Sequence, residues 1–224
     1  MKDGACGGGS AGIAARGGPR GAASITTLFV DVGGVLLTDG WDHRERRRAA
    51  RRFGLDWAEF DARHRLLFEL HERGGVTLDE YLDQAVFAVP RRFTRAAFRR
   101  FMFVQSRPRP GMIEFVRALK ARHGLKIAVV SNEARELNAH RIRAFGLAEF
   151  VDVFVSSCFV RARKPDPDMF RIALDVAQAD PARTLFIDDT PMFVRVAANF
   201  GIRGIVHKDC ASTRAKAAAF GLTQ

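Results

Sequence analysis

Three short apolar runs, each followed at once by polar residues, constrain the fold of this chain more than any other feature. Each run is too short for a helix and suits a strand that is buried on both faces. In an open parallel sheet, ligands bind beyond the carboxyl ends of the strands, so the polar residues there are expected to converge. The runs cover residues 28–30, 126–130 and 184–187, and they end in Asp31, in Ser131-Asn132 and in Asp188-Asp189.

The second half of the chain alternates between helical and strand patterns, which is typical of α/β proteins. Helices are predicted over residues 112–122, 134–145, 168–177 and up to 200, and strands over 25–30, 126–130, 151–155, 184–187 and 204–206. Residues 156–167 are interpreted as a loop. The sequence therefore predicts an α/β fold, a Rossmann-like parallel sheet with helices on both faces.

Between the first strand and residue 108 the pattern is helical. Four helices are predicted, over residues 43–53, 57–71, 78–88 and 95–104, with a C-cap at Gly54 and N-caps at Asp56, Thr77 and Thr94. This block is too long for a single crossover, so it is interpreted as an inserted α-helical cap subdomain. The predicted division is a disordered Gly- and Ala-rich tail over 1–24, a core over 25–40 and 108–224, and a helical cap over 41–107.

The chain is strongly basic, with a formal net charge of +11. The basic residues are spread along the sequence, whereas nucleic-acid binding as a main role needs clustered phosphate contacts, so we do not expect that role. The three cysteines show no C-x-x-C pairing, which argues against a disulfide framework or a Cys-based zinc site. The sequence lacks a secretory signal pattern and any run near the roughly 18 apolar residues that span a bilayer. We therefore expect a cytoplasmic protein without a membrane partner, either a monomer or a homodimer.

The polar residues at the strand ends suggest a metal and phosphate site. Two or three carboxylates in one place repel each other unless a cation lies between them, and a set of oxygen ligands favours Mg²⁺. Mg²⁺ held by few protein ligands usually binds a phosphate as well. The side chains of Ser131 and Asn132 can donate hydrogen bonds to that phosphate, and Lys164 can neutralise its charge.

Each of these residues also has an ordinary structural interpretation. An Asp before a Gly pair, such as Asp31 before Gly33 and Gly34, commonly opens a turn, and Ser-Asn after a strand is usually a turn or a helix cap. A lysine before a proline is usually solvated on the surface. The combination of all these features in this order, and not any single one, favours a functional site.

In this arrangement the chain resembles the haloacid dehalogenase superfamily of phosphohydrolases, in its subfamily with a helical cap. The resemblance covers residues 25 to about 208. The motifs that carry it are Asp31-Val-Gly-Gly-Val-Leu, Ser131-Asn132, Lys164-Pro165-Asp166-Pro167, and Phe186-Ile-Asp188-Asp189 followed by Ala197, Ala198 and Gly201.

The resemblance implies a two-step phosphoryl transfer on a small phosphorylated metabolite. Asp31 would be the nucleophile and form an aspartyl-phosphate that water hydrolyses. Ser131 and Lys164 would hold the phosphoryl oxygens, and Asn132, Gly33 and Gly34 would also contact the substrate. The Mg²⁺ cofactor would be held by Asp31, Asp188, Asp189 and the backbone carbonyl of Gly33.

One departure from the family pattern leaves three functions open. In phosphatases of this superfamily the residue two positions after the nucleophile is a second Asp that protonates the leaving group and then activates water, but this chain has Gly33 there. The first interpretation is a phosphatase for substrates with a good leaving group, such as a sugar 1-phosphate or an acyl phosphate. The second is a catalytically weak protein that binds phosphate and Mg²⁺. The third is a metal-free 2-haloacid dehalogenase.

The cap is expected to decide the substrate, and its sequence gives two further hints. A run of arginines in the first cap helix, between residues 44 and 52, is either a solvated face or a surface that attracts anionic substrates. Trp41 and His43, near the junction with the core, are candidates for reaching into the cleft.

Overall fold

The computed structural model describes residues 24–224. The tail predicted over residues 1–24 therefore lies outside the described residues except for Ser24. Within this range no helix is long and apolar enough to cross a membrane.

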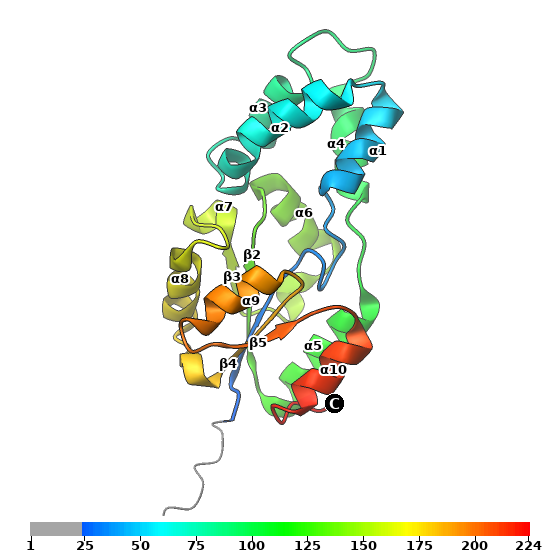
Figure 1. Ribbon diagram of the computed structural model, residues 1–224. Coiled ribbons are helices and arrows are strands. Elements are labelled where there is room, and N and C mark those ends of the chain that lie inside the picture. The colour runs from blue at the N-terminus through cyan, green and yellow to red at the C-terminus, as the bar shows by residue number, and fades with distance from the viewer. Residues whose placement is uncertain (1–23) are drawn as a thin grey trace, which may run out of the picture.

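The described chain is built around one parallel sheet (Figure 1). Its strands are β1 (Thr27–Val30), β2 (Lys126–Ser131), β3 (Val153–Ser156), β4 (Thr184–Asp188) and β5 (Arg203–Val206), in the order β3-β2-β1-β4-β5. Each neighbouring pair is parallel, with Phe29 of β1 opposite Ala128 of β2 and Phe186 of β4. This topology confirms the predicted sheet and places the end of β1 between the ends of β2 and β4.

Helices surround the sheet on both faces and at the carboxyl ends of its strands (Figure 1). The helices of the second half are α5 (Pro110–His123), α6 (Arg135–Ala144), α7 (Ser157–Val160), α8 (Pro167–Ala177), α9 (Pro191–Ala198) and α10 (Cys210–Ala218), with short 3-10 turns η1 (Leu147–Glu149) and η2 (Pro181–Arg183).

Alternate residues of the strands point to opposite faces and build two separate cores. Leu28 and Val30 pack in a cluster with residues of α5 and α10, whereas Phe29 packs in a second cluster with residues of α8 and α9. Because strands buried on both faces consist almost wholly of apolar residues, this arrangement explains the short apolar runs in the sequence.

The first half contributes a block of four helices that lies beyond the carboxyl ends of the strands (Figure 1). These helices are α1 (His43–Phe53), α2 (Trp57–Glu72), α3 (Leu78–Ala85) and α4 (Arg95–Val104). The predicted caps are present: Gly54 adopts a left-handed conformation, Asp56 and Thr94 accept from backbone N–H groups, and Thr77 forms the capping box with Glu80. The block has its own hydrophobic cluster, in which Phe98 is completely buried.

Two segments connect the helical block with the sheet, and they lie side by side. Leu37 of the outgoing segment forms a backbone bridge with Pro108 of the returning one. The Thr38 hydroxyl donates to the carbonyl of Gln105 at 2.8 Å and accepts from the N–H of Arg107. These bonds fix the place where the helical block leaves the sheet.

Three parts of the predicted secondary structure were wrong in detail. The helix expected to reach residue 88 ends at Ala85, because the N–H groups of both Val86 and Phe87 bond to the Leu82 carbonyl and close the last turn. The expected loop at 156–167 contains the one-turn helix α7, which is too short to show a helical period. Helix α10 was not predicted.

Candidate active site

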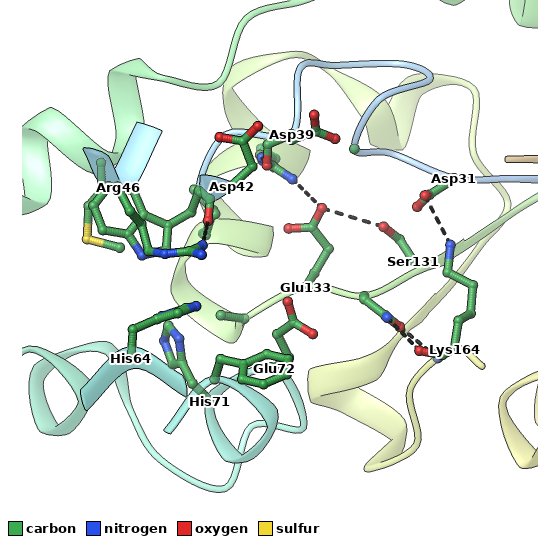
Figure 2. A pocket seen from close by; sticks show the side chains of 18 of the residues that line it. Asp31, Asp39, Asp42, Arg46, His64, His71, Glu72, Ser131, Glu133 and Lys164 are labelled. Carbon is green, nitrogen blue, oxygen red and sulfur yellow. Dashed lines mark hydrogen bonds and ion pairs between the residues drawn. The ribbon is translucent and has the colours of Figure 1, made fainter. Parts of the chain in front are cut away.

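The polar residues at the strand ends converge, as the sequence predicts. Asp31 follows β1, Ser131 ends β2 and Asp188 ends β4. A cavity of about 450 Å³ lies over these ends. Of the predicted site residues, Asp31, Gly33, Ser131, Asn132, Lys164 and Asp189 line this cavity. Figure 2 labels three of them, Asp31, Ser131 and Lys164.

Lys164 lies under the cavity with its side chain fully buried. Its Nζ atom is 3.1 Å from Oδ2 of Asp31 and 2.6 Å from Oδ2 of Asp188. Burial alone would lower the pKa of Lys164, but the two carboxylates outweigh it and raise that pKa above its usual value. The lysine is therefore an ammonium that offsets charge inside the site and not a solvated surface residue.

Three carboxylates form a cluster that could hold a metal ion. One oxygen each of Asp31, Asp188 and Asp189 lies within 4.8 Å of the others. Burial raises the pKa of Asp188, an effect that the nearby Asp31 charge increases and Lys164 opposes, and burial and the Asp31 charge likewise raise the pKa of Asp189. A divalent cation would relieve this repulsion, and an all-oxygen ligand set is the set that Mg²⁺ prefers.

Gly34 allows the first motif to lie against this cluster. It adopts a φ of +73°, and a Cβ atom there would lie only 2.1 Å from Oδ2 of Asp189. Gly33 is different, because a Cβ atom on it would make only ordinary contacts, the nearest with Asp39. The need for glycine is therefore steric at position 34 and absent at position 33.

Ser131 and Asn132 follow each other but differ in their surroundings. The Ser131 hydroxyl lies at the cavity, 3.5 Å from Oε1 of Glu133. The Asn132 side chain is engaged with the backbone of Lys164, donating to its carbonyl at 2.9 Å and accepting from its N–H at 2.8 Å. Asn132 thus holds the lysine loop in place, and its predicted contact with substrate stays a prediction.

The opposite wall of the cavity is formed by the helical block. Figure 2 shows Arg46 of α1 and His64, His71 and Glu72 of α2 across the cavity from Asp31 and Lys164. Burial lowers the pKa of His64 to about 3, assisted by the charge of Arg46, and lowers that of His71 to about 4. Both imidazoles are therefore neutral near pH 7.

The structure separates the two aromatic candidates at the junction. Trp41 lines the cavity, and its indole N–H donates to the Tyr81 hydroxyl. His43 is exposed and packs edge-on against Trp57 at a ring-centroid distance of 5.1 Å. Of the arginines in α1, Arg46 lines this cavity.

Besides His64, His71 and Glu72 of the opposite wall, three further residues of the site were not predicted from the sequence. Glu133 and Arg141 form a buried ion pair beneath the cavity. Burial raises the pKa of Glu133 to about 7, although Arg141 opposes the shift. Arg141 also donates to Ser106 and to the carbonyls of Thr38 and Asp39.

Asp39 is the third missed residue, and it lies on the segment that leaves the sheet for the helical block. Its side chain lines the cavity and is labelled in Figure 2. Partial desolvation of its carboxyl group, together with the nearby Asp42 and Asp31 charges, raises the pKa of Asp39, while Arg141 lowers it. The position of Glu133 next to Ser131-Asn132 was a signal for that residue, but no sequence pattern pointed to Asp39.

Comparison with known proteins gives a consistent result. The model of the haloacid dehalogenase-like hydrolase family matches residues 25–201. A phosphorylated carbohydrates phosphatase from Thermotoga maritima is 26% identical over 190 residues, which cover 82% of this chain and 86% of that protein. A phosphoglycolate phosphatase from Thiobacillus denitrificans is 29% identical over 113 residues, or 50% of this chain. The match spans 49% of the length of that phosphatase. For a second relative it spans 39% of the relative's length.

A solved structure shares the fold at low sequence identity. It is a haloacid dehalogenase family enzyme from Bacteroides thetaiotaomicron, in complex with magnesium and inorganic phosphate. It is 20% identical and aligns with a TM-score of 0.68 over 83% of this chain and 95% of that one.

Proposed function

Because the chain belongs to the haloacid dehalogenase-like hydrolases, whose model spans residues 25–201, we propose that it is an Mg²⁺-dependent phosphohydrolase of small phosphorylated metabolites. The observation that carries this proposal is the cluster of Asp31, Asp188 and Asp189, with the Lys164 ammonium against two of its members. The relatives named as phosphatases and the structural relative with magnesium and phosphate support it.

In this proposal Asp31 is the nucleophile. One of its carboxylate oxygens attacks phosphorus, the bond to the leaving oxygen breaks, and an aspartyl-phosphate forms that water later hydrolyses. Lys164 contacts the Asp31 carboxylate at 3.1 Å and offsets the charge of the phosphoryl oxygens. The Ser131 hydroxyl, which lies at the cavity and makes only a long 3.5 Å contact with Glu133, donates to one of these oxygens.

The carboxylate cluster fits the metal that this chemistry requires. Asp31, Asp188, Asp189 and the backbone carbonyl of Gly33 would hold Mg²⁺, which lowers the repulsion between the nucleophile and the incoming phosphate. The described residues supply oxygen ligands from three carboxylates, so the donor set is suitable for Mg²⁺ and unlike the nitrogen and sulfur sets of zinc sites.

We further propose that the helices over residues 41–107 act as a cap and that residues 25–40 and 108–224 form the core. Arg46, His64 and His71 form the wall that faces the carboxylates, so they would contact the part of the substrate that leaves with its oxygen. A guanidinium and two neutral imidazoles suit a leaving group rich in hydroxyl or carboxylate oxygens, such as a sugar or a hydroxy acid.

A substrate panel with and without Mg²⁺ tests the proposed function. After treatment with a chelator, the protein is expected to release phosphate from members of a set of sugar phosphates, acyl phosphates and p-nitrophenyl phosphate only when Mg²⁺ is restored. Asp31→Asn, which keeps the size of the side chain, is expected to abolish this release. Binding of phosphate and Mg²⁺ without turnover on any compound would instead support a binding protein, and halide release from 2-haloacids without metal would support a dehalogenase.

A further inference from the structure

The carboxylate of another residue lies next to the place that a side chain on Gly33 would take. A Cβ atom built on Gly33 would lie 3.5 Å from Oδ1 of Asp39 and 3.7 Å from its Cα atom. The Cβ atom of any side chain at position 33 would therefore lie in contact with Asp39. Position 33 lacks the carboxylate of an acid-base residue, but the Asp39 carboxylate lies next to it. Asp39 comes eight positions after Asp31 in the sequence.

The backbone of Asp39 is held firmly in this position. Its carbonyl accepts from the N–H of Trp41 at 2.9 Å and from the guanidinium of Arg141. Gly40, with a φ of +77°, brings the chain so close to Arg141 that a Cβ atom there would collide with the guanidinium. Since Arg141 is itself buried and paired with Glu133, the turn that carries Asp39 is fixed to the floor of the cavity.

The Asp39 carboxylate is also the one acidic group of the cavity that has no partner in the described part of the chain. Within residues 24–224, no hydrogen bond or ion pair involves its side-chain oxygens, and the residue is exposed and lines the cavity. The other acidic residues that line the cavity are engaged: Asp42 accepts from the N–H of Glu45, Glu72 pairs with Arg163, Glu133 pairs with Arg141, and Asp31 and Asp189 belong to the metal cluster.

We propose that Asp39 is the general acid-base of this enzyme and replaces the missing carboxylate at position 33; this inference rests on the proposed phosphatase function. In the first step Asp31 bonds to phosphorus, the bond from phosphorus to the leaving oxygen breaks, and the Asp39 carboxyl gives its proton to that oxygen. In the second step the Asp39 carboxylate takes a proton from water as the water oxygen attacks phosphorus. The bond to Asp31 breaks, inorganic phosphate leaves, and Asp39 is protonated again.

The test compares two substrates that differ in their need for an acid. The alkyl phosphate that the wild type hydrolyses fastest has a poor leaving group, whereas p-nitrophenyl phosphate has a good one. Asp39→Asn is expected to lower the steady-state rate on the alkyl phosphate about 10²- to 10⁴-fold, the usual worth of a general acid-base. With p-nitrophenyl phosphate the first step needs no acid, so a burst of one p-nitrophenol per active site is expected before the slow hydrolysis of the aspartyl-phosphate.

A second variant restores the carboxylate from the neighbouring position. A Cβ atom at position 33 would lie in contact with residue 39, and the φ of Gly33 does not require glycine. Gly33→Asp is therefore expected to raise the rate of the Asp39→Asn protein on the alkyl phosphate at least about tenfold. The gain from Gly33→Asp should be smaller in the wild-type background, since groups that share one role are not additive. Asp56→Asn is the matched control, because it removes a carboxylate that caps helix α2 and does not line the cavity, so it should leave the substrate preference unchanged.

The results separate this inference from the proposed function. If the wild type hydrolyses neither substrate, the phosphatase proposal itself fails. If the wild type is active but Asp39→Asn loses the same factor on both substrates without a burst, the assignment of Asp39 is overturned. The assignment is also overturned if the double variant is no faster than Asp39→Asn on the alkyl phosphate. Circular dichroism and thermal unfolding of each variant show that it is folded before its rates are compared.

Discussion

The Nζ atom of Lys164 lies 2.6 Å from Oδ2 of Asp188, and neither side chain is exposed. The same ammonium contacts Asp31 at 3.1 Å. Lys164 therefore holds together two carboxylates that would repel each other without it. This arrangement makes the stability of the protein depend on the metal that the site is proposed to bind.

We expect Lys164→Met to lower the free energy of unfolding by about 3–5 kcal/mol in the absence of Mg²⁺, because removing one partner of a buried pair leaves the other charge uncompensated. Mg²⁺ should raise the melting temperature of Lys164→Met more than that of the wild type, since the cation replaces part of the lost positive charge. Urea and thermal unfolding with and without Mg²⁺ measure both effects. The double variant Lys164→Met/Asp188→Asn is the control and should be more stable than the single variant without metal. Equal Mg²⁺ effects in the wild type and Lys164→Met would contradict this account.

The two glycines of the first motif should respond differently to the same substitution. Gly34→Ala introduces a Cβ atom that would lie 2.1 Å from the Asp189 carboxylate, at a φ of +73°, so Asp189 must move away from the cluster. We expect at least about tenfold weaker Mg²⁺ binding and a loss of about 1–3 kcal/mol in stability, the cost of a strained residue. Gly33→Ala makes only ordinary contacts and should change neither quantity much. Titration calorimetry with Mg²⁺ measures the difference, and similar affinities for both variants would show that the close approach of Gly34 does not shape the site.

The sequence predicted the sheet and the convergence of its strand ends well, because both depend on local patterns. The apolar strands are short and distinct, and Asp31, Ser131 and Asp188 each follow or end such a strand. The helix caps of the first half were also predicted, since Asp56 and Thr77 act on N–H groups within their own helix turns. In contrast, α10 was missed although Asp209 caps it in the same way.

The residues that the sequence could not reveal are placed by contacts between distant segments. Arg141 binds the carbonyl of Asp39, which lies 102 positions away in the chain, so no local pattern links them. Asp39 itself is one of many acidic residues near turns, and its place in the cavity beside Gly33 distinguishes it. The same holds for His64 and His71, which reach the cavity because α2 lies across it from the sheet. Such residues become visible only when the packing of the helical block on the core is known.

The buried histidines of α2 should make stability depend on pH in a defined direction. His71 is 5% exposed and stacks on Tyr81 at a ring-centroid distance of 4.4 Å. Burial lowers its pKa to about 4 from an ordinary value of 6.5, although Glu136 opposes the shift. Between these values the unfolded chain binds a proton at His71 that the folded chain does not. The contribution of a neutral His71 to stability is therefore fully present above pH 6.5 and is lost as the pH falls toward 4.

His71→Phe removes this titration and keeps an aromatic ring against Tyr81. Between pH 4 and 6.5 we expect the free energy of unfolding of the wild type to rise with pH more steeply than that of the variant. The slopes should differ by up to about 1.4 kcal/mol per pH unit, the value for one proton. Leu82→Val is the control, because it removes one methylene from the buried hydrophobic cluster that contains Tyr81. It should shift the whole curve of unfolding free energy against pH without changing its slope. Urea unfolding at a series of pH values measures these curves. Parallel curves for the wild type and His71→Phe would mean that His71 takes up its proton in the folded protein as readily as in the unfolded chain, and that the wall it forms opposite Asp31 is charged at acidic pH.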